Sequence, residues 1–292
     1  MRPVLLPLVQ TLRPRQWIKN IFVAVPLIFG QKLTDPTSLL TTVGAVALFS
    51  LVSGCVYILN DIVDIEKDRA HPTKQHRPLP SGRLSARVAR AFAAVAVPLA
   101  LGLGYWLEPL YALVLGIYFA QNIAYSFKIK NIPYLDVASI AAGFILRVLA
   151  GAFALQLPPS PWLLACTGLL ALFLGFGKRA HEIGSDNSSK QRAALAKYSP
   201  KALRLILYTL AIVTTGVYAA YTLSDHVAEL FGTHKMVYTT VFLVIGIARF
   251  TQITTHGSDA ESPTEEMLRD PLFMTNFVIG VIVSTAILYG WI

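Results

Sequence analysis

Charged residues are scarce in this chain of 292 residues: they make up 14% of it, whereas hydrophobic residues make up 54%. Soluble globular domains average about 25% charged residues, so this deficit argues against a soluble protein. It also excludes an intrinsically disordered chain, which needs low hydrophobicity and high charge. The 16 Asp and Glu residues are outnumbered by 25 Lys and Arg residues, so the formal net charge is +9. The positions of these few charges therefore become the main question.

Cysteine is almost absent. Cys55 and Cys166 both lie in apolar runs, and the sequence contains no CxxC pair or Cys/His metal spacing. This argues against a disulfide scaffold or a structural zinc site and favours two small core residues. The first apolar stretch begins near Ile18 and many others follow it. It is therefore interpreted as a first membrane span rather than a cleaved signal peptide.

Long apolar segments dominate what is present. A transmembrane helix needs about 20 mostly apolar residues, and the sequence offers nine such segments. The first of them is short and contains Pro26. The predicted fold is all-α, a polytopic membrane protein of nine transmembrane helices, at 18–34, 39–60, 88–107, 109–127, 135–156, 160–177, 203–223, 235–253 and 272–291.

The basic residues divide sharply between the two ends of these spans. All Lys and Arg residues except Lys32, Lys235 and Arg147 fall on the side of the N-terminal tail and the even-numbered connections. Cytoplasmic loops carry the Lys/Arg excess, which places the N-terminus in the cytoplasm and the C-terminus outside. The outer connections are too short for a soluble domain, so residues 1–292 are predicted to form a single transmembrane domain. Long polar loops follow both span two and span six, a weak similarity that suggests an internal repeat of four-helix units.

An acidic motif follows the second predicted span. Asn60, Asp64 and Asp68 are spaced by four, so on a helix they share one face, and Asp61 lies beside them. Bare carboxylates are costly at the membrane boundary. Hard divalent cations prefer carboxylate and amide oxygens, and Mg²⁺ is usually completed by substrate phosphates. The spacing therefore favours a magnesium site over a solvated acidic helix end.

The same connection then becomes basic and ends in Arg77-Pro78-Leu79-Pro80-Ser81-Gly82. Acidic ligands followed by Lys and Arg are what a metal–diphosphate complex requires, because the metal neutralises some oxygens and the side chains neutralise others. This ordered pattern, Asn60-Asp61-x-x-Asp64-x-x-x-Asp68 with the Arg77 segment, resembles the UbiA superfamily of intramembrane prenyltransferases. The resemblance implies a helical bundle around a cytoplasm-facing polar cavity, in which Asn60, Asp61, Asp64 and Asp68 hold Mg²⁺ bound to a diphosphate.

Most members of that superfamily carry a second aspartate-rich motif at the end of span six. Here Lys178, Arg179 and Glu182 stand in its place, which suits a ligand with additional phosphate. The N-terminal stretch from Leu12 to Asn20 resembles the decaprenyl-phosphate phosphoribosyltransferase branch. So do the segments around Tyr125–Lys130, Tyr134–Asp136, Arg192–Ser199 and Ser262–Pro271.

This branch implies Mg²⁺-dependent transfer of 5-phosphoribose from phosphoribosyl pyrophosphate to a polyprenyl phosphate such as decaprenyl phosphate, for a lipid-linked arabinose precursor of the cell wall. It implies a multi-pass protein of the bacterial inner membrane whose active site faces the cytoplasm; a homo-oligomer is compatible with it. The predicted catalytic residues are Asp61, Asp64, Lys128 and Arg147, and the predicted substrate-binding residues are Lys19, Asn20, Lys67, Arg77, Tyr125, Lys130, Asp136, Lys178, Arg179, Glu182, Arg192 and Tyr198.

Several of these residues have plainer alternatives. A membrane-buried arginine such as Arg147 faces a polar cavity or a partner, here a lipid phosphate or an acidic residue of the site, with snorkelling as the alternative. Asp136 could serve the site or only cap its helix. Trp17 and the basic residues near it could simply anchor the chain at the interface, although the resemblance favours Lys19 and Asn20 as lining the site.

Two other functions compete with this one. A UbiA-type aromatic prenyltransferase, with a polyprenyl diphosphate donor, would share Mg²⁺ and the first acidic motif but should have the second. A transporter would place charges near the bilayer midplane, where only Arg147 is predicted to lie. A nucleic-acid partner is not expected, because the basic residues share their membrane face with carboxylates.

Overall fold

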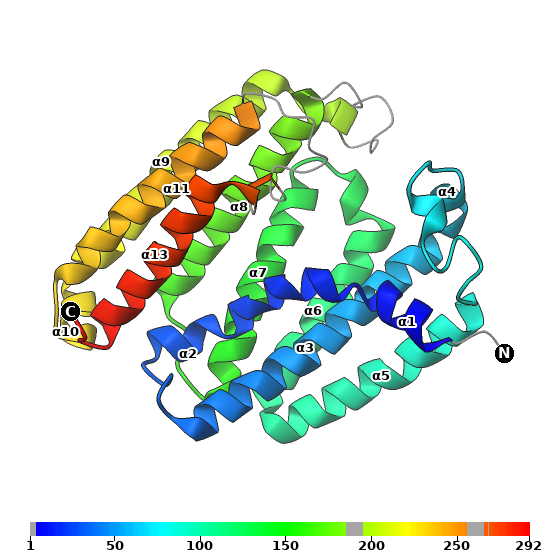
Figure 1. Ribbon diagram of the computed structural model, residues 1–292, viewed down its shortest axis with the longest axis horizontal. Helices are drawn as coiled ribbons and strands as arrows, with labels where there is room; N and C mark the ends of the chain where they lie inside the picture. Colours follow the sequence, from blue (N-terminus) through cyan, green and yellow to red (C-terminus); the bar gives the residue numbers. More distant parts are fainter. Residues whose placement is uncertain (1–3, 185–194, 256–265, 268) are drawn as a thin grey trace. The chain divides into compact units, whose positions relative to one another are not determined.

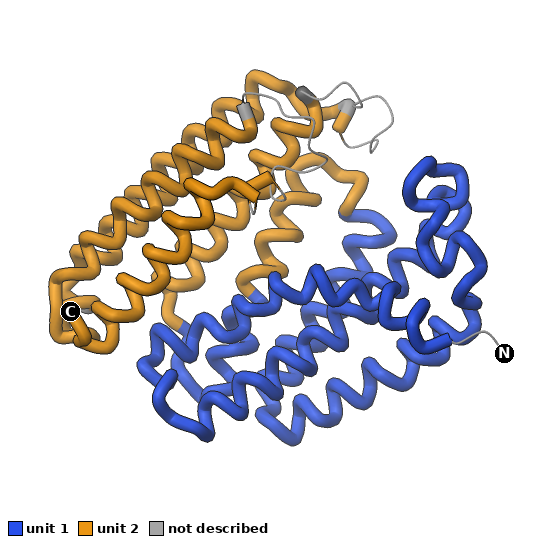
Figure 2. Tube along the Cα trace, in the orientation of Figure 1, with its two compact units in different colours: residues 1–129, 146–159 blue, residues 130–145, 160–292 orange. Residues whose placement is uncertain are grey.

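The computed structural model of this chain describes residues 4–184, 195–255, 266–267 and 269–292. Over these residues every regular element is a helix (Figure 1), which confirms the all-α prediction. By their contacts the residues divide into two compact units (Figure 2). The first comprises Met1–Ile129 and Leu146–Pro159, and the second comprises Lys130–Ile145 and Ser160–Ile292. A single domain over residues 1–292 stays a prediction, since this division rests on contacts alone.

Among the described residues, eight helices are long and apolar enough to cross a membrane. Their bounds follow the predicted spans closely, and α6 (Pro109–Phe127) matches its prediction at both ends. Five others are α3 (Pro36–Val63), α5 (Ala86–Leu107), α7 (Leu135–Ala154), α8 (Pro161–Gly184) and α9 (Pro200–Leu223). The last two are η6 (Lys235–Thr239) continued by α11 (Thr240–Thr255), and α13 (Pro271–Leu288). A short helix that was not predicted, α10 (Asp225–Phe231), follows α9.

Of the nine predicted transmembrane helices, the first, predicted as short and containing Pro26, is not among the eight found in the part of the chain that the structure describes. The segment predicted as the first span, 18–34, is divided among η1 (Pro14–Val23), α2 (Val25–Phe29) and the turn after them, and α1 (Leu5–Leu12) precedes it. Proline causes the division, because it lacks the N–H that a helix interior needs, and both η1 and α2 have one near their start. Arg13, between α1 and η1, has a left-handed backbone with φ of 52°.

This broken segment nevertheless runs beside α3 in the opposite direction. Arg13 pairs with Asp61 near the end of α3, and the Asn20 side chain bonds to Ser50 and Ser53 further back. Leu12 packs against α3 where Gly54 leaves room, since a Cβ there would lie 2.7 Å from a Leu12 methyl group. Small residues and interhelical hydrogen bonds are what hold membrane helices together.

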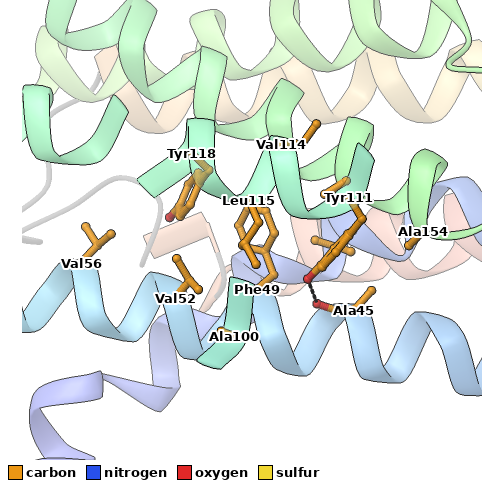
Figure 3. Packing of buried hydrophobic residues seen from close by; sticks show 12 residues of the cluster. Ala45, Phe49, Val52, Val56, Ala100, Tyr111, Val114, Leu115, Tyr118 and Ala154 are labelled. Carbon is orange, nitrogen blue, oxygen red and sulfur yellow. Dashed lines mark hydrogen bonds between the residues drawn. The ribbon is translucent and has the colours of Figure 1, made fainter. Parts of the chain in front are cut away.

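The core of the first unit lies between α3, α5, α6 and the end of α7 (Figure 3). Phe49 of α3 and Tyr111 and Leu115 of α6 are fully buried. The Tyr111 hydroxyl donates to the Ala45 carbonyl oxygen at 2.7 Å, so the one polar atom of this large ring is satisfied inside the core. A second cluster, around Leu12 and Ile58, packs α1 and α3 against α5 and the connection that follows α4 (Ile65–Arg69).

The second unit has its own core, in which α8, α9 and α11 meet at Phe173, Leu207 and Phe250. The Phe173 and Phe250 rings lie 5.2 Å apart between centroids. Next to this core along α8, Val137 and Phe176 pack with Tyr198 and Leu203. Tyr198 follows η5 (Leu195–Lys197) and precedes α9, so this smaller cluster fixes the start of α9 against α7 and α8.

Candidate active site

The acidic motif lies where α3 ends. Asp64 is the residue between α3 and α4, with a backbone that departs from helical geometry. The four-residue register persists across it, because the Asp64 N–H donates to the Asn60 carbonyl at 3.0 Å and the Asp68 N–H to the Asp64 carbonyl at 2.8 Å. The buried carboxylates are those of Asp61 and Asp68, 2% and 5% exposed, and Asn60 and Asp64 are half-buried.

Two arginines neutralise these buried carboxylates. Arg77 Nη1 lies 2.6 Å from Asp68 Oδ2 and 3.3 Å from Asp61 Oδ1, so that one guanidinium nitrogen bridges two acids seven residues apart. Arg13 pairs with the same Asp61 oxygen, and its guanidinium lies 4.9 Å from the centre of the Tyr57 ring. The result is an alternating row of charges, Arg13, Asp61, Arg77 and Asp68, which we call the arginine–aspartate row.

The segment 77–84 folds into a compact turn that fixes the backbone of Arg77. The Ser81 N–H and hydroxyl both donate to the Arg77 carbonyl, at 3.0 and 2.6 Å. Gly82 has φ of 73°, a left-handed conformation that glycine adopts without steric cost. Leu79 and Leu84 are buried in the cluster around Leu12 and Ile58. The Arg-Pro-Leu-Pro-Ser-Gly pattern thus encodes a rigid support for the Arg77 side chain.

The donor set of this motif fits Mg²⁺ by its chemistry. Carboxylate and amide oxygens are the hard ligands that this ion takes, and the ion pairs show that the site needs positive charge between Asp61 and Asp68. Within the described residues, no group of three or more His, Cys, Asp and Glu side chains is already gathered for a metal ion.

A second polar cluster lies deep in the first unit, around Arg147. Its Nε donates to the Asn20 side-chain oxygen at 2.9 Å and its Nη2 to the Tyr118 hydroxyl at 3.0 Å. The guanidinium also lies over the rings of Phe49 and Tyr118, at 5.3 and 4.9 Å from their centroids. Asn20 and Arg147 are buried. The structure thus places these two predicted site residues in direct contact; the catalytic role of Arg147 stays a prediction.

Four other predicted site residues meet in the second unit. Arg179 Nε donates to Asp136 Oδ2 at 2.9 Å, and its Nη1 pairs with Glu182. The Tyr198 hydroxyl donates to the other Asp136 oxygen at 2.6 Å. Asp136 and Arg179 are 1% and 3% exposed. The Arg179 guanidinium thus holds two carboxylates together. We call Asp136, Arg179, Glu182 and Tyr198 the Asp136–Arg179 network.

Tyr198 also receives a hydrogen bond from the backbone of Tyr134, whose N–H lies 2.6 Å from the Tyr198 hydroxyl. Tyr134 has φ of 67°, which is uncommon for a bulky residue. Burial, followed by the hydrogen bond to Asp136, raises the pKa of the Tyr198 phenol above its ordinary value. The hydroxyl therefore remains protonated and keeps donating to Asp136 over the neutral range.

The remaining predicted residues are cationic or aromatic side chains near the ends of spans. In the first unit Lys19, Lys67 and Lys128 are exposed and Tyr125 is half-buried; in the second, Lys130 and Lys178 are half-buried. Arg192 lies outside the described residues. Arg13 and Tyr118 were not predicted as site residues. The Arg-Pro pair at 13–14 could have indicated the break between α1 and η1 at which Arg13 lies. Nothing in the sequence distinguishes Tyr118 from the other residues of its apolar helix, α6.

Known proteins resemble this chain over nearly its whole length. A family model for the UbiA prenyltransferase family matches residues 21–277. The decaprenyl-phosphate phosphoribosyltransferase of Corynebacterium glutamicum is 32% identical over 271 residues, which cover 90% of this chain and 81% of the relative. That of Mycolicibacterium smegmatis is 30% identical over 294 residues, 97% and 92% of the two chains. A UbiA homolog from Archaeoglobus fulgidus, bound to DMAPP and Mg²⁺, shares the fold with a TM-score of 0.72 at 20% identity, covering 97% and 98%.

Proposed function

Since the chain belongs to the UbiA prenyltransferase family and is an integral multi-pass membrane protein, we propose that it transfers 5-phosphoribose from phosphoribosyl pyrophosphate to a polyprenyl phosphate, decaprenyl phosphate in the first instance. Pyrophosphate is released, and the product is a lipid-linked precursor of cell-wall arabinose. The observation that carries the proposal is the 30% identity with the Mycolicibacterium smegmatis enzyme across 97% of this chain, which includes the acidic motif and both compact units.

Mg²⁺ is the proposed cofactor, held by Asn60, Asp61, Asp64 and Asp68. When bound there, the ion neutralises charge that develops on the leaving pyrophosphate. The chain's own cations supply the rest of that neutralisation. Arg77 already contacts two of the acidic residues, and Lys128, Lys130 and Lys178 are the further candidates for contacts with phosphate oxygens.

The nucleophile is an oxygen of the polyprenyl phosphate. It forms a bond to the anomeric carbon of ribose as the bond from that carbon to pyrophosphate breaks. A phosphate monoester loses its second proton near pH 6, so the acceptor is nucleophilic at neutral pH and needs no general base from the chain. The task of the protein is then to hold two anions close together, which requires the cationic side chains named above.

The Asp136–Arg179 network supports this chemistry indirectly. Arg179 is committed to Asp136 and Glu182, and Tyr198 ties Asp136 to the backbone of Tyr134. We propose that the network fixes the segment that precedes α7, which carries Lys130. The cytoplasmic face of the bacterial plasma membrane is the proposed location of the site, because the basic connections gather on that side of the spans.

Activity in detergent tests the proposal. Purified protein with Mg²⁺, radiolabelled phosphoribosyl pyrophosphate and decaprenyl phosphate should give a labelled product that extracts into organic solvent. The substitution Asp64→Asn should lower the rate by about 100-fold or more, since it removes a charge that the transition state uses. Glu66→Gln is the matched control: Glu66 is an exposed neighbour whose side chain pairs with Arg69, and its loss should leave the rate unchanged.

Two results would contradict the proposal in different ways. Full activity of the Asp64→Asn variant would show that the acidic motif does not hold the metal. If the wild-type protein gave no phosphoribosyl lipid but transferred the polyprenyl group of a polyprenyl diphosphate to an aromatic acid, with release of pyrophosphate, the alternative function, an aromatic prenyltransferase, would replace the first.

A further inference from the structure

Arg77 occupies a position that a bound cation would contest. Its Nη1 lies within hydrogen-bonding distance of Asp68 and close to Asp61, and these are two of the four proposed metal ligands. A carboxylate that pairs with a guanidinium is a weaker ligand for another cation, because the two positive charges repel each other at short range. Cation binding and the Arg77 contacts therefore compete for the same oxygens.

The two arginines of the row differ in their freedom to move. The Arg13 guanidinium is confined between Asp61 and the Tyr57 ring, on a backbone between α1 and η1. The Arg13 and Arg77 side chains are about equally exposed, at 29% and 32%, but in the described part of the chain no aromatic ring lies over the Arg77 guanidinium. Arg77 has a fixed backbone. Its long flexible stem can swing outward while Cα stays in place. Arg77 is thus able to change partners, whereas Arg13 is built to remain with Asp61.

An anion that arrives together with the cation would give Arg77 its new partner. Guanidinium groups bind phosphate oxygens with two parallel hydrogen bonds, and a diphosphate–cation complex brings such oxygens to the acidic motif. Moving Arg77 from carboxylate to phosphate leaves no charge unpaired: the cation replaces the guanidinium on Asp61 and Asp68, and the diphosphate replaces the carboxylates on the guanidinium. Without such replacement, the buried carboxylates of Asp61 and Asp68 would lose a counter-ion, which is unfavourable.

We infer that Arg77 is an exchangeable counter-ion that makes the site accept a divalent cation together with a diphosphate rather than the cation alone, while Arg13 positions Asp61. This inference rests on the proposed function, since it concerns the same site. Its consequence is a coupling: pyrophosphate should tighten Mg²⁺ binding, and Arg77 should be responsible for part of that effect.

Calorimetric titration of the full-length protein in detergent measures this coupling without any transfer reaction. Mg²⁺ is titrated alone and in the presence of inorganic pyrophosphate, with the affinity of Mg²⁺ for free pyrophosphate subtracted. In the wild-type protein pyrophosphate should tighten Mg²⁺ binding. In the Arg77→Gln variant Mg²⁺ alone should bind at least about tenfold tighter, the lower end of the coupling measured for close charge pairs, and the enhancement by pyrophosphate should fall by a similar factor.

Two further variants separate the effect from changes in folding and overall charge. Arg87→Gln removes an exposed arginine from the first turn of α5, at the end of the same connection, and should leave both affinities unchanged. Arg77→Lys keeps the charge and should lie between the wild type and Arg77→Gln, which keeps the test open if Arg77→Gln unfolds.

The inference is overturned if Mg²⁺ alone binds Arg77→Gln or Arg77→Lys no more tightly than the wild type, or if pyrophosphate does not tighten Mg²⁺ binding to the wild type. These failures are distinguishable from failure of the proposed function. A protein that shows the coupling but makes no phosphoribosyl lipid would keep the inference and lose the function, and the reverse result would keep the function and lose the inference.

Discussion

Replacing Tyr198 with phenylalanine should destabilise the second unit, because this hydroxyl joins three elements. It donates to Asp136 at 2.6 Å and accepts from the Tyr134 N–H at 2.6 Å. Asp136 in turn holds Arg179. The substitution keeps the ring and its packing, including the contact with the Tyr134 ring at 4.7 Å between centroids, so the change isolates the hydroxyl.

The size of the effect follows from the two hydrogen bonds. A bond to a charged group contributes about 1.5–3 kcal/mol, and Asp136 is almost completely buried, so no water replaces the lost donor. The Tyr134 N–H also loses its acceptor in the variant, which adds to this cost. Arg179 still neutralises Asp136 in the variant. We therefore expect a loss of about 2–3 kcal/mol in the free energy of unfolding.

Thermal or denaturant unfolding in detergent, followed by circular dichroism, measures this loss. Tyr208→Phe is the matched control, since Tyr208 lies on α9 and is 50% exposed; its melting temperature should equal that of the wild type. A raised pKa in the folded state means that the contribution of Tyr198 is complete below the unfolded pKa near 10 and declines as the pH rises above it. The gap between wild type and Tyr198→Phe should therefore narrow in alkaline buffer. A variant within about 0.5 kcal/mol of the wild type at neutral pH, which is the range of ordinary surface substitutions, would refute the reasoning.

Two further predictions concern stability. Gly151→Ala would place a Cβ 1.9 Å from the Val23 carbonyl oxygen, so this severe overpacking should lower the free energy of unfolding by at least about 3 kcal/mol. Gly44→Ala has no atom within 4 Å of its new Cβ and should instead add up to about 1 kcal/mol of helix stability. Comparable losses of melting temperature in both variants would contradict this prediction. Asp270→Asn should lower the melting temperature at neutral pH, because the hydrogen bond from Arg249 lowers the pKa of Asp270 below its ordinary 3.8. The difference should begin to shrink as the pH falls below 3.8 and should vanish below the lowered pKa of the folded state. A difference that persists in strong acid would exclude the ion pair as its cause.

The long helices could be predicted from the sequence because the bilayer imposes a length on them. Hydropathy alone set the bounds of α6, and those of α5 and α7 within two residues. The prediction of the first span was wrong because of contacts that are distant in sequence. Its prolines were visible, but the broken segment is held in place by packing of Leu12 on Gly54 and of the Val23 backbone on Gly151. No local pattern announces a partner more than 40 residues away.

The candidate site divides in the same way. Spacing identified the acidic residues, because helical geometry relates positions four apart. It grouped Asn60 with Asp64 and Asp68, whereas the buried carboxylates are Asp61 and Asp68, seven apart and bridged by Arg77. Which arginine reaches which carboxylate depends on the turn at 77–84, and this turn is defined by packing of Leu79 and Leu84 rather than by charge.

The structure shows contacts of the N-terminal stretch from Leu12 to Asn20 that composition could not predict. Trp and basic residues near a span are explained as interface anchors, and Trp17 does donate its ring N–H to the Leu12 carbonyl at 3.1 Å, which steadies the break in the helix. Yet Arg13 contacts the acidic motif, and Asn20, seven residues further on, contacts Arg147. At about 2.0 Å of rise per residue in a 3₁₀ helix, η1 carries these two contacts about 14 Å apart. The stretch from Arg13 to Asn20 thus contacts both the proposed metal ligands and the buried arginine.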